Sequence, residues 1–197
     1  DLNQFLKAQN IVGICGIDTR ALTKKLRESG VMNGMIIASD TCPSVDETLL
    51  SKIKAYRVEK SVETVSCIQQ NSELKFNDIA KTWPETNHNI LHPGKKIRIV
   101  LWDFGAKYNI QRELEKRDAE VIVVPYSYTA EDILKLNPDG IMLSNGPGDP
   151  ADNVGVIAEI KKICDAAKDG KLVIFGICLG HQMLALARGA KTSKLKY

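Results

Sequence analysis

The sequence predicts an α/β fold, in which a doubly wound parallel sheet is preceded by part of a small α+β amino-terminal domain. From Lys96 onward, short apolar runs suited to buried strands alternate with helical segments, as they do in parallel sheets. Glycine-rich loops follow the later runs, and in such sheets function gathers at the carboxyl ends of the strands. A separate strand–helix–strand pattern precedes residue 58, and the polar stretch after it predicts a domain boundary.

Composition narrows the class of protein. Charged residues make up 26% of the 197 residues and apolar residues 44%, which is ordinary for a globular protein with a sizeable core. A net charge of +3 is too mild to indicate nucleic-acid binding, and no apolar run is long enough to predict a membrane span. The five cysteines are scattered and form no C-x-x-C pair, so we expect no disulfide framework, no metal site and a reducing, cytoplasmic setting.

Residues 1–58 are predicted to form part of the small amino-terminal domain. Two glycine-dotted apolar runs, 11–17 and 31–38, are expected to be strands on either side of a helix over 20–29. Asp18 and Thr19 supply N-cap side chains for this helix, and Gly30 and a second helix over 48–56 follow it. This β-α-β unit indicates no chemistry by itself.

Residues 59–96 are predicted to form a connecting arm. Polar residues dominate it, and Trp83-Pro84 and His92-Pro93-Gly94 are turn signals. We therefore expect an irregular or β-rich segment.

Residues 97–197 are predicted to hold the main domain, because strand and helix patterns alternate regularly there. The expected strands are 97–102, 120–125, 141–144 and 172–177, and the expected helices are 109–116, 130–136, 154–167 and 181–187.

The last of these strands leads into a candidate nucleophile. Cys178 follows the strand at a tight turn into a helix, with Gly176 and Gly180 on either side of it. This is the nucleophile-elbow pattern G-x-S-x-G with sulfur in place of the hydroxyl oxygen. The following helix favours a thiolate at its amino end. The alternative is a buried cysteine at the end of a core strand.

A second loop at the same edge could serve this nucleophile. Residues 145–150 (NGPGDP) follow the third strand, and their glycines expose backbone N–H groups. A thiolate that attacks an amide creates an oxyanion, and one preorganised donor lowers the barrier by about 3 kcal/mol. The N–H of Leu179, directly after the nucleophile, and one from this loop are the natural donors. Taken alone, the loop could be an ordinary tight turn.

These residues resemble a known family. Residues 176–182 (GICLGHQ), preceded by 144–150 (SNGPGDP), are similar to the class I, or triad-type, glutamine amidotransferase domain. Residues 103–107 (DFGAK) with Asn109-Ile110, and residues 16–23 (GIDTRALT), narrow the resemblance to the small, glutamine-hydrolysing subunits of carbamoyl-phosphate synthase. Amidotransferases of GMP or anthranilate synthesis lack the amino-terminal domain that carries the second of these motifs.

The resemblance implies a reaction and roles for matching residues. Cys178 would attack the side-chain amide of glutamine and form a γ-glutamyl thioester, and Gly146 and Leu179 would bind the oxyanion. Gly148 and Gln182 would help to hold the amino-acid end of the substrate. The released ammonia would pass to a large synthetase subunit, which makes carbamoyl phosphate for arginine and pyrimidine biosynthesis. No Walker-type loop occurs in the chain, so ATP and Mg are expected on that partner, and no cofactor is expected here.

The general base is where the chain departs from the family pattern. In the family, a His-x-Glu pair beyond the elbow supplies the base and the carboxylate that orients it. His88, His92 and His181 are not followed by Glu at the second position. The chain also lacks a starting methionine, so we expect an internal fragment whose base lies after Tyr197. A Cys178–His181 dyad is the weaker alternative, because nothing evident orients that imidazole.

Two other functions remain open from the sequence. The missing His-x-Glu pair is compatible with a catalytically inactive binding or regulatory module that keeps the amidotransferase fold. A cysteine hydrolase acting on other amides would share the elbow, although the two subunit-specific motifs count against it.

Overall fold

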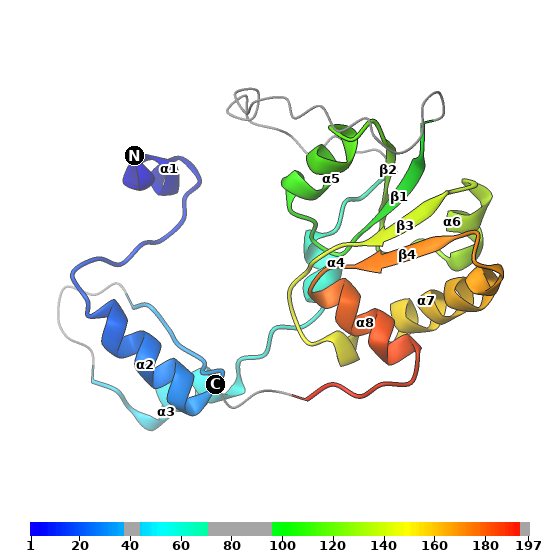
Figure 1. Cartoon of the computed structure of the whole chain (residues 1–197). Coiled ribbons are helices and arrows are strands. Elements are labelled where there is room, and N and C mark those ends of the chain that lie inside the picture. The colour runs from blue at the N-terminus through cyan, green and yellow to red at the C-terminus, as the bar shows by residue number, and fades with distance from the viewer. Residues whose placement is uncertain (38–43, 71–95, 194–197) are drawn as a thin grey trace. The chain divides into compact units, whose positions relative to one another are not determined.

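The computed structural model describes residues 1–37, 44–70 and 96–193 (Figure 1). The chain divides into two compact units, the smaller holding Asp1–Arg57 and the larger Val58–Thr192. No helix in the described ranges is long and apolar enough to cross a membrane.

The described part of the smaller unit consists of helices and connecting segments. Its helices are α1 (Leu2–Ala8), α2 (Thr19–Ser29) and α3 (Glu47–Ala55). The side chain of Asp18 accepts a hydrogen bond from the backbone N–H of Ala21 at 2.9 Å, so it caps α2 as predicted. The helix expected over 48–56 is confirmed as α3. Helix α1 was not anticipated.

The two strands expected in this unit are not formed, and those predictions were wrong. Residues 11–17 and 31–37 have no strand pairing among the residues described, while Ala38 lies outside them. Exposed fractions of 72% for Val12 and 89% for Val31 show why. An apolar run becomes a strand only when its backbone groups are paired by a neighbour, and neither run has one within the described ranges.

The larger unit holds the predicted parallel sheet. Its strands are β1 (Arg98–Asp103), β2 (Glu120–Pro125), β3 (Gly140–Leu143) and β4 (Val173–Gly176), in the order β2-β1-β3-β4. All neighbouring pairs are parallel. The direction in which successive strands are added to the sheet therefore reverses between β1 and β3, and this is the switch point where open α/β sheets bind ligands.

Helices cover both faces of this sheet, which confirms the doubly wound prediction. The helices are α5 (Tyr108–Glu115), α6 (Ala130–Lys135), α7 (Val154–Ala166) and α8 (Leu179–Ala187), with short 3₁₀ turns η2 (Pro150–Asp152) and η3 (Ala167–Asp169). Helix α5 packs against β2 on one face, whereas α6, α7 and α8 lie on the other (Figure 1).

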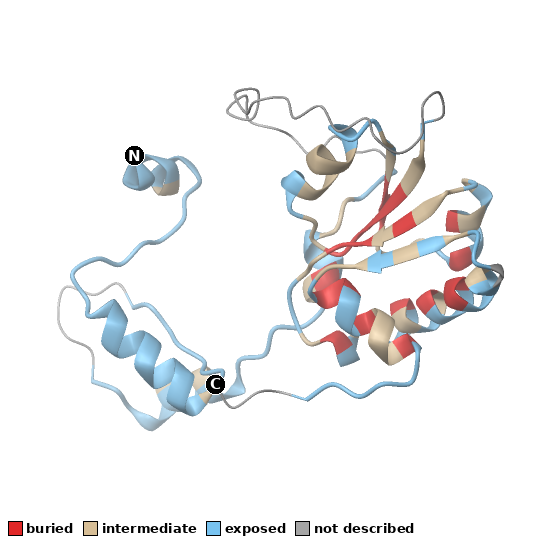
Figure 2. Ribbon diagram, in the orientation of Figure 1, coloured by how far each residue is buried: buried red, intermediate tan, exposed pale blue. Residues whose placement is uncertain are grey.

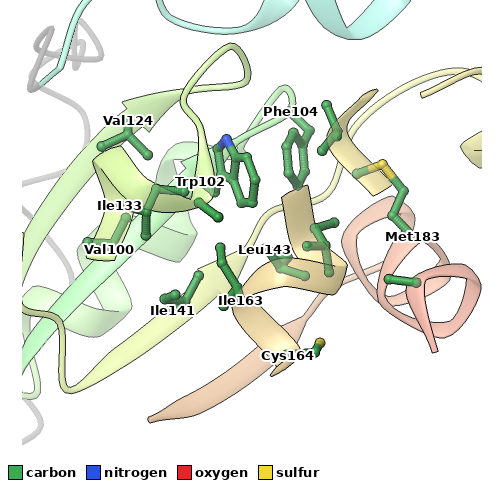
Figure 3. Packing of buried hydrophobic residues seen from close by; sticks show 14 of the residues in the cluster. Val100, Trp102, Phe104, Val124, Ile133, Ile141, Leu143, Ile163, Cys164 and Met183 are labelled. Carbon is green, nitrogen blue, oxygen red and sulfur yellow. The ribbon is translucent and has the colours of Figure 1, made fainter. Parts of the chain in front are cut away.

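The main core lies between the sheet and the second group of helices (Figure 2). Trp102 is fully buried at its centre, 5.5 Å from the Phe104 ring between centroids, and Ile133, Ile163 and Met183 pack in the same cluster (Figure 3). The Trp102 indole N–H donates to the backbone carbonyls of Pro125 and Tyr126 at the end of β2, so the only polar atom of this side chain is satisfied.

The opposite face is only partly covered. A groove of about 430 Å³ runs along β3 and β4 there, and Val173 and Phe175 on its rim are 65% and 60% exposed. Strand β4 is one of the two edge strands of the described sheet, which accounts for the exposure of its outward side chains.

The arm predicted for residues 59–96 differs from expectation at its start. Residues 61–65 form a short helix, α4 (Ser61–Val65), rather than irregular or β structure, and Val62 of this helix is buried in the main core. Residues 71–95 lie outside the described ranges. The domain limits at 58, 59 and 96 stay a prediction.

Replacing Ile163 with Ala tests the importance of this core. Ile163 is 1% exposed, so Ile163→Ala should lower the free energy of unfolding by about 2–5 kcal/mol. Val154 on the same helix is 71% exposed, and Val154→Ala should change it by less than about 0.5 kcal/mol. Urea denaturation followed by circular dichroism measures both, and equal effects would contradict the packing described.

Candidate active site at the carboxyl edge of the sheet

The parallel pairing of β3 with β4 brings the two predicted site segments together. Leu143 pairs with Gly176 at the carboxyl ends of these strands. The backbone N–H of Ile177 then donates to the Leu143 carbonyl at 3.0 Å, and that of Gly180 donates to the Ser144 carbonyl at 3.1 Å. Each segment is thus hydrogen-bonded to the other directly after its strand.

Cys178 stands at a sharp turn between β4 and α8. Its φ of 50° and ψ of −110° are unusual for any residue other than glycine, and its side chain is exposed. Such backbone strain costs about 1–3 kcal/mol and gathers at functional sites. The elbow geometry expected from the sequence is therefore present, and the alternative of a cysteine buried at the end of a core strand is wrong.

The glycines on either side of Cys178 are required by close packing. A β-carbon on Gly176 would lie 2.6 Å from the backbone nitrogen of His181. One on Gly180 would overlap the Leu143 carbonyl group of the neighbouring strand. Real β-carbons do not approach other atoms so closely, so the elbow can form only with glycine at both positions.

The loop over 145–150 supplies the second half of the site. A β-carbon on Gly146 would lie 2.7 Å from a methyl group of Leu179, so the loop packs directly on the start of α8. Across the described part of the chain, the backbone N–H groups of Gly146 and Leu179 have no hydrogen-bond acceptor. They are the two donors that the sequence predicted for an oxyanion.

Two polar side chains, one buried and one half-buried, hold this loop to the end of β1. Ser144 is completely buried, and its hydroxyl oxygen accepts from the Phe104 N–H at 2.8 Å and donates to the Asn145 carbonyl at 2.8 Å. The Asn145 side chain accepts from the Lys107 N–H and donates to the Gly105 carbonyl, both at 3.0 Å. These side chains are therefore satisfied by backbone groups and need not reorganise at this contact.

Asp103 organises the end of β1, a role that the sequence did not predict. Its carboxylate is 1% exposed and accepts three backbone N–H bonds, from Gly105 at 2.8 Å, Ala106 at 2.7 Å and Cys67 at 2.7 Å. The local signal was an acidic residue at the end of a buried strand, directly before a glycine turn. No sequence pattern around Cys67, which donates to this carboxylate from the predicted arm, indicated the contact.

Of the remaining predicted residues, Gly148 lies in the loop over 145–150 with φ of 89°, and His181 and Gln182 lie on the first turn of α8. Gln182 is exposed, and its N–H donates to the Cys178 carbonyl at 3.0 Å. His181 is also exposed, and within the described ranges it makes no hydrogen bond to Cys178. His88 and His92 lie outside the described residues.

Cys178 and Cys164 differ in solvent exposure. Cys164 is 8% exposed on the core side of α7, and burial raises the pKa of its thiol. It is therefore a packing residue at neutral pH. Cys178 is exposed beside the N–H donors of Gly146 and Leu179, an arrangement suited to nucleophilic attack on an acyl group.

Comparison with known families agrees with this site. Residues 100–197 match the family Glutamine amidotransferase class-I, and residues 1–36 match the family Carbamoyl-phosphate synthase small chain, CPSase domain. The first match contains the loop over 145–150 and the elbow at Cys178. The fold and site thus define a class I glutamine amidotransferase domain.

Curated relatives narrow the family further. The chain is 47% identical over 196 residues to a carbamoyl phosphate synthase small chain from Bacillus thuringiensis subsp. konkukian, covering 100% of this chain and 46% of the relative. It is 44% identical over 196 residues to the pyrimidine-specific small chain of Bacillus subtilis, covering 47% of that protein. The chain spans about half the length of these relatives, and it belongs to the family of carbamoyl-phosphate synthase small chains.

Replacing Gly180 with Ala tests the close packing of the elbow. Gly180→Ala drives a methyl group into the Leu143 carbonyl and should lower the free energy of unfolding by about 1–3 kcal/mol. Gly155, in the first turn of α7, would have no atom within 4 Å of an added β-carbon, so Gly155→Ala should instead stabilise the protein by about 0.5–1 kcal/mol. Chemical denaturation of both variants would refute the packing if their effects had the same sign.

Replacing Asp103 with Asn tests the carboxylate at the end of β1. In Asn an NH2 group replaces one carboxylate oxygen and faces a backbone N–H instead of accepting from it, so Asp103→Asn should cost about 1–3 kcal/mol of stability. Asp118 is exposed in a turn with φ of 62°, and Asp118→Asn should be neutral there because Asn tolerates that conformation. Thermal unfolding that ranks the two variants equally would argue against the proposed network.

Proposed function

We propose that this chain carries the nucleophile and oxyanion site of a glutaminase that serves carbamoyl-phosphate synthesis. L-glutamine is hydrolysed, and the ammonia is used by a large synthetase subunit. The observation that carries the proposal is the strained, exposed Cys178 beside the N–H donors of Gly146 and Leu179. The 47% identity to a carbamoyl phosphate synthase small chain supports the choice of substrate and partner.

The chemistry follows from the placement of these groups. The Cys178 thiolate attacks the side-chain amide carbon of glutamine, and the carbonyl oxygen becomes an oxyanion that accepts from Gly146 and Leu179. Collapse of this intermediate breaks the C–N bond, and the nitrogen leaves as ammonia after gaining a proton. Water then cleaves the γ-glutamyl thioester, which releases glutamate and restores the thiol.

Two further residues would bind the non-reacting part of the substrate. Gly148 belongs to the loop that packs on α8, and Gln182 lies one helical turn beyond Cys178. Backbone and amide groups of this kind suit the amino-acid end of glutamine. The family resemblance assigns the general base to a His-x-Glu pair rather than to His181, and none of His88, His92 and His181 belongs to such a pair.

The family relationship supports the remaining roles. Bicarbonate and ATP, with Mg, would be bound by the large synthetase partner, and this chain would need no cofactor of its own. Carbamoyl phosphate would enter arginine and pyrimidine biosynthesis, and one relative is named pyrimidine-specific. The scattered cysteines favour action in the cytoplasm. Residues 1–58 would form the amino-terminal domain, 59–96 the arm, and 97–197 the amidotransferase domain.

Replacing Cys178 with Ser tests the nucleophile in the protein purified together with its synthetase partner. Cys178→Ser should reduce glutamine-dependent carbamoyl phosphate synthesis by at least about a thousandfold, because a serine hydroxyl is a far weaker nucleophile here. Synthesis from added ammonia should persist.

Cys15→Ser is the matched control, since Cys15 is also exposed but lies in the smaller unit. It should leave glutamine-dependent synthesis intact. A Cys178→Ser variant that still hydrolyses glutamine would disprove the mechanism. A wild-type protein that binds its partner but hydrolyses no glutamine would favour the inactive regulatory module.

A further inference from the structure

Residues 58–70, here called the carboxyl-edge strap, run past the strand ends that form the candidate site. Figure 1 shows α4, within the strap, beside the carboxyl ends of the strands. The Ser66 hydroxyl donates to the Asp103 carbonyl at 2.7 Å and accepts from the Tyr126 N–H at 2.9 Å, so it joins the ends of β1 and β2. The strap lies outside both matched family segments, 1–36 and 100–197.

The strap also contacts the loop that the site uses. The Ser61 hydroxyl donates to the Pro147 carbonyl at 3.2 Å, across 86 residues of sequence. A β-carbon on Gly148 would overlap the Ser61 hydroxyl oxygen, so this oxygen lies directly against the Gly148 α-carbon. Val62, the next residue, is 2% exposed in the main core and fixes the position of Ser61.

This hydrogen bond controls the orientation of one peptide group. The Pro147 carbonyl and the Gly148 N–H belong to the same trans peptide, in which they point in opposite directions. With the carbonyl held toward Ser61, the Gly148 N–H is held away from it. Proline followed by glycine with φ of 89° is typical of a type II turn, whose central peptide can flip to reverse both groups.

We propose that Ser61 is a positioning residue for substrate binding, and that it acts by locking the Pro147–Gly148 peptide. The proposal rests on the proposed function, in which Gly148 helps to hold the amino-acid end of glutamine. A flipped peptide presents a carbonyl oxygen where an N–H should stand, and thereby opposes the substrate group that the N–H binds. Ser61 affects substrate binding more than the chemical step, because Cys178, Gly146 and Leu179 are placed by other contacts.

The test compares two hydroxyl deletions on the same helix, in the protein purified with its synthetase partner. Ser61→Ala should raise the KM for glutamine by about threefold to tenfold, as expected for one lost hydrogen bond, with a smaller change in kcat. Thr64→Ala is the matched control, because the Thr64 hydroxyl donates to the Lys60 carbonyl within the helix and not to the loop. It should leave KM and kcat unchanged.

Two further measurements separate positioning from a general loss of structure. Alkylation of Cys178 by iodoacetamide, followed by peptide mapping, should proceed at the same rate in Ser61→Ala as in the wild type. Ser61→Thr retains the hydroxyl and should restore a KM near that of the wild type. If Ser61→Ala does not fold, a KM near the wild-type value in Ser61→Thr and unchanged Cys178 alkylation still support the role, and a raised KM in Ser61→Thr opposes it.

The outcomes distinguish this proposal from the one on which it rests. An unchanged KM in Ser61→Ala, in a protein whose glutaminase activity depends on Cys178, overturns the role of Ser61 alone. If Ser61→Ala and Thr64→Ala changed kcat and KM to the same extent, α4 would contribute only to the stability of the protein. Absence of glutaminase activity in the wild type overturns the proposed function itself.

Discussion

The site depends on one constraint, the parallel pairing of β3 with β4 in the register that sets Leu143 opposite Gly176. Because parallel strands end at the same edge, this register places the loop after β3 beside the elbow after β4. The Gly180 N–H then bonds to the Ser144 carbonyl, and α8 starts in contact with the loop. A shift of one residue would turn each side chain of β4 to the other face and separate the two proposed oxyanion donors, the N–H groups of Gly146 and Leu179.

A polar network keeps the donors in place without relying on solvent. The carboxylate of Asp103 and the hydroxyl of Ser144 are both buried, and each is satisfied by backbone groups from neighbouring segments. Donors of an oxyanion stabilise a transition state only if they need not reorganise when charge develops. The packing of Leu179 and Met183 in the core offsets the backbone strain at Cys178. The rigidity of these segments therefore belongs to the proposed mechanism.

Sequence patterns predicted the larger unit well because local and long-range forces agree there. The apolar runs over 97–102 and 120–125 pair with one another as β1 and β2, so the pattern and the neighbour coincide. The run over 11–17 has the same apolar character but no partner strand in the described ranges. The apolar pattern of a run does not by itself predict whether another strand pairs with it. Cys67 and Asp103 lie 36 residues apart in sequence, and no periodicity reports such a contact. The five-residue helix α4 is likewise held by tertiary packing rather than propensity.

For the glycines of the site, the sequence and the structure give different and complementary reasons why glycine is needed. From the sequence, each glycine is explained by the tight turn that it permits. For Gly148 this reason alone is enough, because its φ of 89° is a conformation that favours glycine. The structure adds that a β-carbon at each glycine would overlap a specific neighbour. These neighbours are the Phe104 carbonyl for Gly146, the Leu143 carbonyl for Gly180 and the Ser61 hydroxyl for Gly148. The last pair joins a loop of the amidotransferase domain to a segment that no family match covers. A side chain at 148 would displace the Ser61 hydroxyl even if the backbone could accept it. Glycine at 148 and serine at 61 therefore form one structural unit, although 86 residues separate Ser61 from the carbonyl that it binds.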